Sequence, residues 1–470
     1  MSGGARRGAV SAWLERSLPR LKPFRGLDRP DRVWAWGMYD LANQSFTLLI
    51  NTMLFSLFFK KVVAAPAVEG TGDRLWGITV SVSLLLVVVS GPVIGAVADS
   101  RAWKKELLVW FWGLCVALTV GLAFVPSGEG GVWAVALAMA LYIPANIAFN
   151  LGENMLAAFL PELAGRGTIG RVSAIGWTMG YVGALALLVL TLVLMLAFDL
   201  RDESQWRPLF VFAGLWFGVM ALPTVLLLKE EARPRALPGA RTLVGAGVKR
   251  VVDSVTHASA FRDLSVFLVA FFVYAFGVQA VIFFSGIIAR DDFGFGTTKL
   301  VLFIAVTAIA AGVGAVAVGM VQDRLGHKNT VAVVLGLWVQ NGLGLAGLAW
   351  GLDLGMIDRG PAEGVLWVLG NGIGLALGAV GSASRACVGY FTPRHRTAEF
   401  FGLWGLAYKS AGVFGAAGFG AVREAFGGVA SLLSLAAVFA VGGAVLSFVD
   451  EARGGACATR AEEESLGGGA

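Results

Sequence analysis

Gly95-Ala-Val-Ala-Asp99-Ser-Arg101-Ala-Trp-Lys104 and Gly319-Met-Val-Gln-Asp323-Arg324-Leu-Gly-His-Lys328 are two copies of one pattern. In both copies an Asp stands four positions after the Gly, and a Lys stands five positions after the Asp. Each copy lies between two long apolar stretches, and about half of the chain separates them. A repeat at this distance is typical of membrane transporters built from two homologous halves.

The composition indicates a membrane protein. Of the 470 residues, 57% are hydrophobic and 14% are charged, whereas about a quarter of a soluble domain is charged. The three cysteines and three histidines have no spacing typical of a disulfide framework or a metal site, so we expect no metal and no cofactor. Basic loops account for the net charge of +6, so we expect no nucleic-acid partner.

The apolar segments predict an all-α, polytopic membrane protein with twelve transmembrane helices in two six-helix bundles. Each segment has about 20 residues, which is enough to cross about 30 Å of hydrocarbon. The predicted parts are a cytoplasmic arm (1–32), a first bundle (33–228), a cytoplasmic linker (229–263), a second bundle (264–449) and a cytoplasmic tail (450–470). The Gly, Ala and Glu content of the tail predicts disorder.

The basic residues predict the orientation. With both termini in the cytoplasm, most of the 37 Lys and Arg residues lie on the cytoplasmic side, as the positive-inside rule requires. We therefore expect a multi-pass protein of the cytoplasmic (inner) membrane, surrounded by the lipid bilayer and monomeric.

Two of the apolar segments carry polar stripes. In the first segment Asp40, Asn43, Thr47 and Asn51 are spaced by three, four and four positions, which places them on one helix face. The fourth segment repeats this pattern with Asn146, Asn150, Glu153 and Asn154. Unpaired polar groups facing lipid would cost several kcal/mol. The stripes therefore either line a wet cavity or hydrogen-bond the helices to one another.

Three charged residues inside the apolar segments are candidates for a transport role. The functional reading of Asp40 and Glu153 is a carboxylate that binds a proton or a cation; the structural alternative is a hydrogen-bonded acid near the interface. Lys409 lies near the middle of the eleventh segment. Its ammonium either answers an anionic group of a substrate or pairs with an acid on a neighbouring helix.

The two repeated segments are candidates for gating. Charges at the cytoplasmic ends of helices can latch one conformation of a carrier, and the glycines allow a neighbouring helix to come close. The structural alternative is a basic loop that serves topology alone. The gating candidates are Gly95, Asp99 and Arg101 in the first copy and Gly319, Asp323 and Arg324 in the second.

The two copies resemble the loop motif of the major facilitator superfamily, Gly-x-x-x-Asp-Arg-x-Gly-Arg-Lys. The second copy fits this motif with His327 in place of an arginine. The first copy departs from it, because Ser100, Ala102 and Trp103 replace the central Arg, Gly and Arg.

A second resemblance covers nearly all of the apolar segments. Three signatures, in the same order, are similar to those of the autophagy-related vacuole effluxer family and its bacterial relatives. The opening signature is Tyr39-Asp-Leu-Ala-Asn-Gln-Ser-Phe46. The middle one combines Asn154–Leu163 with Gly170–Ser173 and Gly180-Tyr181, and the last combines Ser384-Arg385 with Ala398–Leu403 and Lys409.

This resemblance implies the major facilitator fold and a secondary transporter, not an enzyme. Yeast members of the family are associated with efflux of amino acids from the vacuole, so a small zwitterion is the expected substrate. Asp40 would meet its amino group and Lys409 its carboxylate, with hydrogen bonds from the remaining candidates: Asn43, Thr47, Asn150 and Glu153. The proton is the candidate coupling ion. The alternative functions are a polytopic membrane enzyme and a non-transporting sensor on the same fold.

Overall fold

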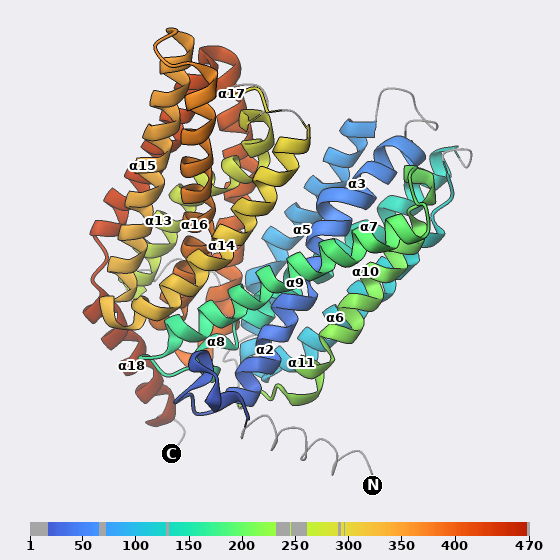
Figure 1. The fold of residues 1–470 in the computed structure, drawn as a ribbon. Helices are drawn as coiled ribbons and strands as arrows, with labels where there is room; N and C mark the ends of the chain where they lie inside the picture. The colour runs from blue at the N-terminus through green and yellow to red at the C-terminus, as the bar shows by residue number, and fades with distance from the viewer. Residues whose placement is uncertain are drawn as a thin grey trace. The chain divides into compact units, whose positions relative to one another are not determined.

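The computed structural model describes residues 17–64, 72–127, 131–231, 245, 261–289, 293–295 and 297–467. These residues form helices and no strand, which confirms the expected all-α class. They divide into two compact units (Figure 1). Unit 1 comprises residues 1–163 and 179–248, and unit 2 comprises residues 164–178 and 249–470. The predicted linker, 229–263, lies largely outside the described residues.

Unit 1 contains the first apolar spans, in an order that follows the sequence. The first span begins with α2 (Pro30–Ala42) and continues through a π-helical stretch, η3 (Ser45–Met53), α3 (Leu54–Phe58) and a second π-helical stretch, η4 (Phe59–Ala64). The other helices of this unit are α5 (Gly72–Arg101), α6 (Lys104–Gly121), α7 (Gly131–Ala157), α8 (Leu160–Leu163), most of α9 (Ile169–Ala197), α10 (Arg207–Met220) and α11 (Leu222–Leu227).

The first span is buried among the other helices of unit 1. The indole Nε1–H of the fully buried Trp36 donates to the carbonyl oxygen of Leu156 at 2.8 Å, which ties α2 to α7. The ring of Tyr39 packs edge-on against Phe217 of α10, with 5.3 Å between the ring centroids. These contacts fix which face of the first span meets α7, and that face carries the polar stripe.

Unit 2 contains five long helices and a short one at the end of the chain. They are α13 (Arg262–Ile287), α14 (Thr297–Leu325), α15 (His327–Asp353), α16 (Arg359–Phe391), α17 (Thr397–Ser447) and α18 (Glu451–Gly467). Eleven of the described helical segments are long and apolar enough to cross a membrane. The longest, α17, is broken at Gly427, whose φ of 86° is not helical. Counting both parts of α17 gives twelve apolar segments, as expected from the sequence.

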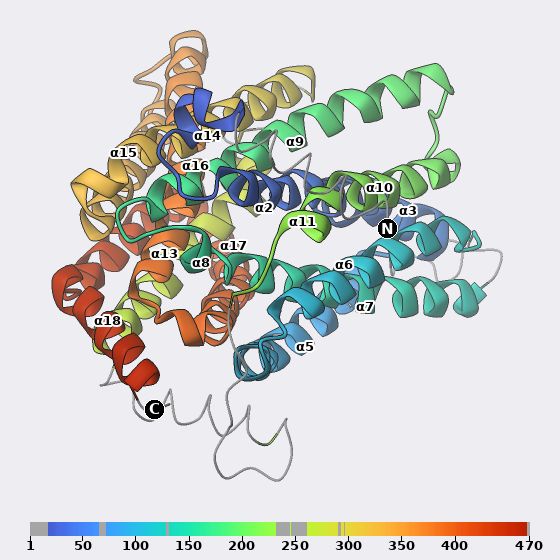
Figure 2. The ribbon, with the colours of Figure 1, turned by 90° about the horizontal axis from the view of Figure 1, so that it is seen from below.

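The tail after Asp450 differs from its prediction. It forms the helix α18, which packs against α13 and α16 within unit 2 (Figure 2). The Arg453 guanidinium binds the Asp263 carboxylate through Nε at 2.8 Å and Nη2 at 2.7 Å. Gly454 is buried beside the ring of Phe391, where a larger side chain would collide. The disorder predicted from composition was therefore wrong for Glu451–Gly467.

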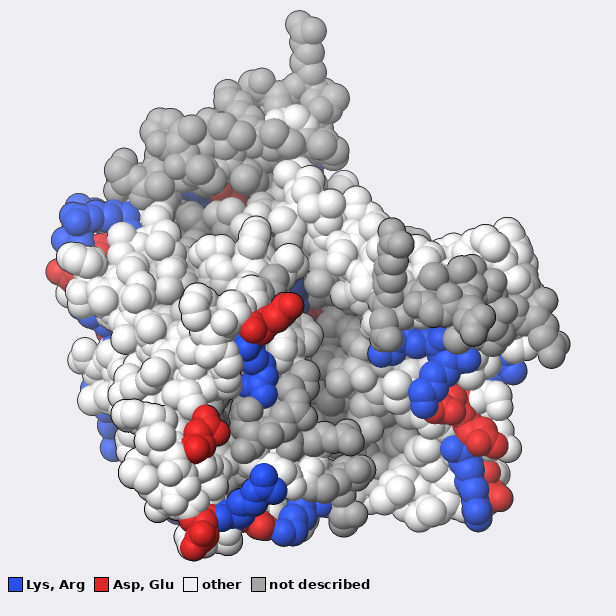
Figure 3. All heavy atoms as spheres, turned by 90° about the horizontal axis from the view of Figure 1, so that it is seen from above, with Lys and Arg blue, Asp and Glu red and all other residues white. Residues whose placement is uncertain are grey.

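Charged side chains at the end of the molecule seen in Figure 3 are few, and red and blue groups there lie next to each other. Two exposed ion pairs at helix ends likewise join an acidic and a basic side chain. Lys61 contacts Glu203 at 2.5 Å, and Lys299 contacts Glu363 at 2.8 Å. Such exposed pairs contribute little to stability, about 0–1 kcal/mol each.

Candidate functional site

The polar stripes of the first span and of α7 face each other inside unit 1. The side-chain amide of Asn43 donates to Oε1 of Glu153 at 3.2 Å. Two helical turns further on, the amide of Asn51 donates to Oδ1 of Asn146 at 3.4 Å. Asn146 also accepts a bond at 3.1 Å from Asn150, one turn along α7. Of the two alternatives that the sequence left open for the stripes, hydrogen bonding between the helices is present in the structure.

Two residues that the sequence analysis did not select complete this network. The hydroxyl of Tyr142 donates to Oδ1 of Asn51 at 2.9 Å. The amide of Asn146 donates to Oγ of Ser83, on α5, at 2.7 Å. Tyr142 stands four positions before Asn146, so continuing the α7 stripe by one turn would have found it. No comparable pattern marks Ser83.

The network separates into buried and half-buried members. Asn43, Asn146 and Asn150 are 1–3% exposed, and their amides are engaged with neighbouring polar groups. Asp40, Thr47 and Glu153, in contrast, are half-buried. The buried amides therefore hold the first span, α5 and α7 together. The half-buried groups, which include both carboxylates, keep part of their surface exposed.

Lys409 lies on α17 in unit 2, in aromatic surroundings. Its ammonium is 5.5 Å from the ring centroid of Tyr408. The Tyr408 ring stacks on Trp404 and on Phe271 of α13, with centroids 6.3 and 6.0 Å apart. Aromatic faces attract cations, so this setting lowers the cost of placing the ammonium within a membrane span. The sequence analysis weighed only anionic partners for Lys409 and did not consider aromatic ones.

The second copy of the repeated pattern holds the start of α9 within unit 2. The Asp323 carboxylate accepts the backbone N–H of Gly170 at 2.8 Å through Oδ1 and that of Arg171 at 3.0 Å through Oδ2. These amides belong to the first turn of α9, where N–H groups lack helical partners and a negative charge is favourable. Gly319 lies against Ala174, where a side chain would collide. Arg324, the remaining candidate in this copy, is exposed.

A buried arginine fixes the same segment from α16. Arg385 is 5% exposed, and its Nη2 donates to the carbonyl oxygen of Ser173 at 2.8 Å. The Ser173 hydroxyl in turn donates to the carbonyl oxygen of Ser382 at 2.9 Å. The guanidinium also lies over the Trp177 ring, 5.7 Å from its centroid. Arg385 was part of a family signature in the sequence but was not selected as a site residue.

The first copy of the pattern has a different set of contacts. Lys104 is fully buried and pairs with Glu162, which follows α7, and its ammonium is 5.5 Å from the centroid of the Phe159 ring. Gly95 and Asp99 are buried within α5, whereas Arg101 is exposed and lies over the Trp103 ring at 6.0 Å.

A carboxylate caps the helix that follows each copy. Glu451 accepts the backbone N–H groups of His327 and Lys328, both at 2.9 Å, at the start of α15. Glu230 accepts the backbone N–H of Lys105 at 2.9 Å, at the start of α6. Each glutamate stands two residues after a buried apolar residue, Leu228 in unit 1 and Val449 in unit 2. Burial raises the pKa of Glu230 to about 7, although nearby Lys104 opposes this rise.

The comparisons with known proteins agree with these features. The model of a family described as vacuole effluxer Atg22 like matches residues 75–459. The chain belongs to this family. One relative is the uncharacterized MFS-type transporter YxiO of Bacillus subtilis, which is 24% identical over 428 residues, 89% of this chain and 94% of that protein. The middle and last signatures quoted from the sequence lie inside the matched range, and the opening signature, Tyr39–Phe46, lies before it.

The chain is also similar to a fungal protein and to a solved transporter structure. Autophagy-related protein 22-2 of Aspergillus clavatus is 27% identical over 271 residues, 55% of this chain and 44% of that protein. The match thus spans about half the length of this fungal relative. The solved structure of the major facilitator proton:xylose symporter XylE has a TM-score of 0.69 at 14% identity, covering 89% of this chain and 95% of that one. This Atg22-like chain is therefore a multi-pass transporter with the major facilitator fold.

Proposed function

We propose that the protein is a secondary active transporter of a small zwitterion, most simply an amino acid, and that it works by alternating access across the cytoplasmic membrane. The observation that carries this proposal is the contact between Asn43 and Glu153. It places a half-buried carboxylate, with Asp40 nearby in the first span, at the edge of a buried amide network inside a membrane unit. Intramembrane carboxylates are expensive and usually mark a substrate or ion pathway.

The chemistry of the candidate residues favours a zwitterion. Asp40 and Glu153 supply negative charge for an ammonium group, and Thr47 adds a half-buried hydroxyl. Lys409 supplies positive charge for a carboxylate, and the face of the Tyr408 ring beside it attracts the ammonium. Asn43 and Asn150 then act through hydrogen bonds that orient these groups. Charge-assisted hydrogen bonds at both ends of the solute would distinguish it from a neutral sugar.

Protons are the coupling ion in this proposal. A carboxylate in a membrane span changes its charge when it binds a proton, and substrate binding and release can follow that change. Asp323 and the repeated segments supply the gate: Gly95, Asp99, Arg101, Gly319, Asp323 and Arg324. The protein acts as a monomer with both termini in the cytoplasm, as the positive-inside rule favours.

Counterflow in proteoliposomes tests the substrate class. Vesicles containing purified protein are loaded with a mixture of unlabelled amino acids, and parallel vesicles are loaded with unlabelled sugars or organic anions. Entry of the matching labelled solutes is followed in each. We expect at least one labelled amino acid to accumulate transiently, and we expect labelled sugars not to do so. Accumulation of sugars or organic anions alone would contradict the zwitterion proposal while leaving transport itself intact.

A further inference from the structure

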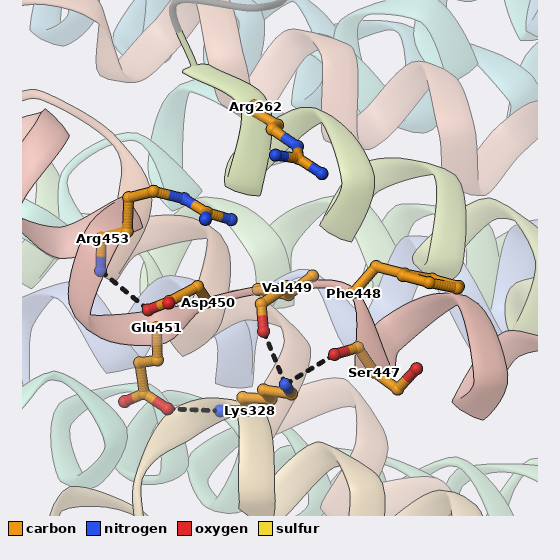
Figure 4. A pocket seen from close by; sticks show the side chains of 8 residues that line it. All are labelled: Arg262, Lys328, Ser447, Phe448, Val449, Asp450, Glu451 and Arg453. Atoms are coloured by element: carbon orange, nitrogen blue, oxygen red, sulfur yellow. Dashed lines mark hydrogen bonds between the residues drawn. The ribbon is translucent and has the colours of Figure 1, made fainter.

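A cavity of about 410 Å³ lies within unit 2 (Figure 4). Three cationic side chains line it from three elements: Arg262 at the start of α13, Lys328 at the start of α15 and Arg453 in α18. Its other walls are the main chain and side chains of residues 447–451, where α17 ends. The cavity thus sits where three apolar spans meet the aqueous phase.

The hydrogen-bond donors of this cavity exceed its free acceptors. Within the described part of the chain, the Arg262 guanidinium has no hydrogen bond or ion pair, and in Figure 4 it points into the space beside Arg453. Lys328 donates to the carbonyl oxygens of Ser447 and Val449 at 2.9 and 2.6 Å, which leaves one of its three N–H groups free.

The acids that line the cavity accept hydrogen bonds from the main chain. Both oxygens of Glu451 accept backbone N–H groups at the start of α15. Oδ1 of Asp450 accepts the backbone N–H of Arg453 at 2.9 Å. Arg453 is already paired with Asp263 through Nε and Nη2. The unused donors are therefore those of the Arg262 guanidinium and one N–H of Lys328. A planar guanidinium favours an anion with several oxygens, such as phosphate.

We propose that this cavity binds the phosphate group of an anionic lipid headgroup. Phe448, which lines the cavity, is 69% exposed and offers an apolar surface to an acyl chain. A free phosphate ion has no apolar part that would use this surface. Basic pockets at the cytoplasmic ends of membrane helices are suited to anionic headgroups. By the orientation proposed above, this end of unit 2 faces the anionic inner surface of the membrane. The bound lipid would tie α13, α15 and α18 together.

The test measures the melting temperature of the purified full-length protein in mild detergent as phosphatidylglycerol is added. Phosphatidylcholine and inorganic phosphate are added in parallel. We expect a saturable rise with phosphatidylglycerol, and Arg262→Gln should increase the half-saturating concentration about tenfold, the effect of losing one charge-assisted hydrogen bond. Arg394→Gln is the matched control, because Arg394 is exposed, outside the cavity, and its loss changes the net charge equally.

The possible results separate the site from its alternatives. An equal effect of Arg262→Gln and Arg394→Gln, or no saturable rise, would overturn the proposal. Inorganic phosphate could raise the melting temperature as much as phosphatidylglycerol does, with no change in Phe448→Ala. That result would overturn the lipid proposal, and the ligand would be a soluble anion. Arg262→Lys keeps the charge and should retain most of the binding. This variant shows whether weaker binding by Arg262→Gln comes from the lost charge or from a folding defect.

Discussion

Ala102 adopts a backbone conformation that alanine rarely takes. Its φ is 55°, and Gly326, at the same place in the second copy of the repeated pattern, has a φ of 91°. The turn between the two helices therefore requires a positive φ in both copies, and the first copy meets this requirement without glycine. A left-handed conformation costs a non-glycine residue about 1–2 kcal/mol.

We therefore predict that Ala102→Gly raises the free energy of unfolding by about 1 kcal/mol. The melting temperature of the purified variant measures this effect. Ala98→Gly is the control, because Ala98 lies inside α5. Glycine at a helical position should instead destabilise by about 0.5–1 kcal/mol. A loss of stability in Ala102→Gly equal to that in Ala98→Gly would contradict the strain at this turn.

Glu230 makes stability depend on pH. Its folded-state pKa of about 7 lies above the unfolded value of about 4.3, so folding favours the protonated form. The stabilising contribution of protonation is full below about pH 4.3 and is lost as the pH rises through 7. Glu230→Gln, which stays neutral, should therefore melt higher than the wild type at pH 8 and at nearly the same temperature at pH 5.

The control for this prediction is Glu463→Gln, an equal change of charge at an exposed position of α18. Its difference from the wild type should stay constant between pH 5 and pH 8. If Glu230→Gln shows the same constant difference, burial does not control the proton affinity of Glu230.

At the scale of helices, the sequence predicted where the spans lie but not how they bend. Spacing of polar residues predicted a polar stripe on the first span and another on α7, and left open whether the stripes line a cavity or bond to each other. In the structure Asn43 of the first stripe contacts Glu153 of the second. The π-helical stretch Ser45–Met53 was missed, because it depends on contacts that a periodic pattern does not contain. One of these is the Thr52 hydroxyl, which bonds the carbonyl oxygen of Thr47 five residues earlier at 2.8 Å.

The helix α18 was missed for a related reason. Its Gly and Glu content suggested disorder, but its glycines have a packing role: Gly454 and Gly455 lie against Phe391 and Tyr390. The Glu451 cap and the Arg453 pair with Asp263 complete the attachment. Each of these partners is far away in the sequence, so no local signal could have predicted the attachment.

The Asp323 cap on α9 gives a prediction about gating. Asp323→Asn leaves one oxygen where two accept the N–H groups of Gly170 and Arg171. We expect it to weaken the attachment of α9 by about 1 kcal/mol and to change the initial rate of transport, while the protein still folds. Counterflow rates and melting temperature measure the two effects.

The matched control is Asp358→Asn. Asp358 precedes α16 and makes no capping hydrogen bond with its side chain. It should therefore leave transport unchanged. An unchanged transport rate in a folded Asp323→Asn variant would mean that the repeated segment serves topology rather than gating.

At the scale of the whole molecule, the internal repeat predicted more than any single segment. With its resemblance to the superfamily's loop motif, it predicted the transporter class and the major facilitator fold, which the family match and the likeness to XylE bear out. The repeat also extends further than the quoted pattern, since Glu230 and Glu451 cap α6 and α15 in the same way. These two caps could not be predicted from the repeated pattern, because each glutamate lies far from the capped helix in the sequence. The predicted domain boundaries remain predictions.

The central claim is coupled transport through the carboxylates of unit 1. The most direct measurement is accumulation of the substrate found by counterflow, driven by a pH gradient across proteoliposomes. We expect the wild type to accumulate substrate, and we expect Asp40→Asn or Glu153→Gln to abolish accumulation while keeping exchange, because exchange needs no net change in protonation. Asp358→Asn should behave like the wild type. Full proton-driven accumulation by both Asp40→Asn and Glu153→Gln would contradict the account.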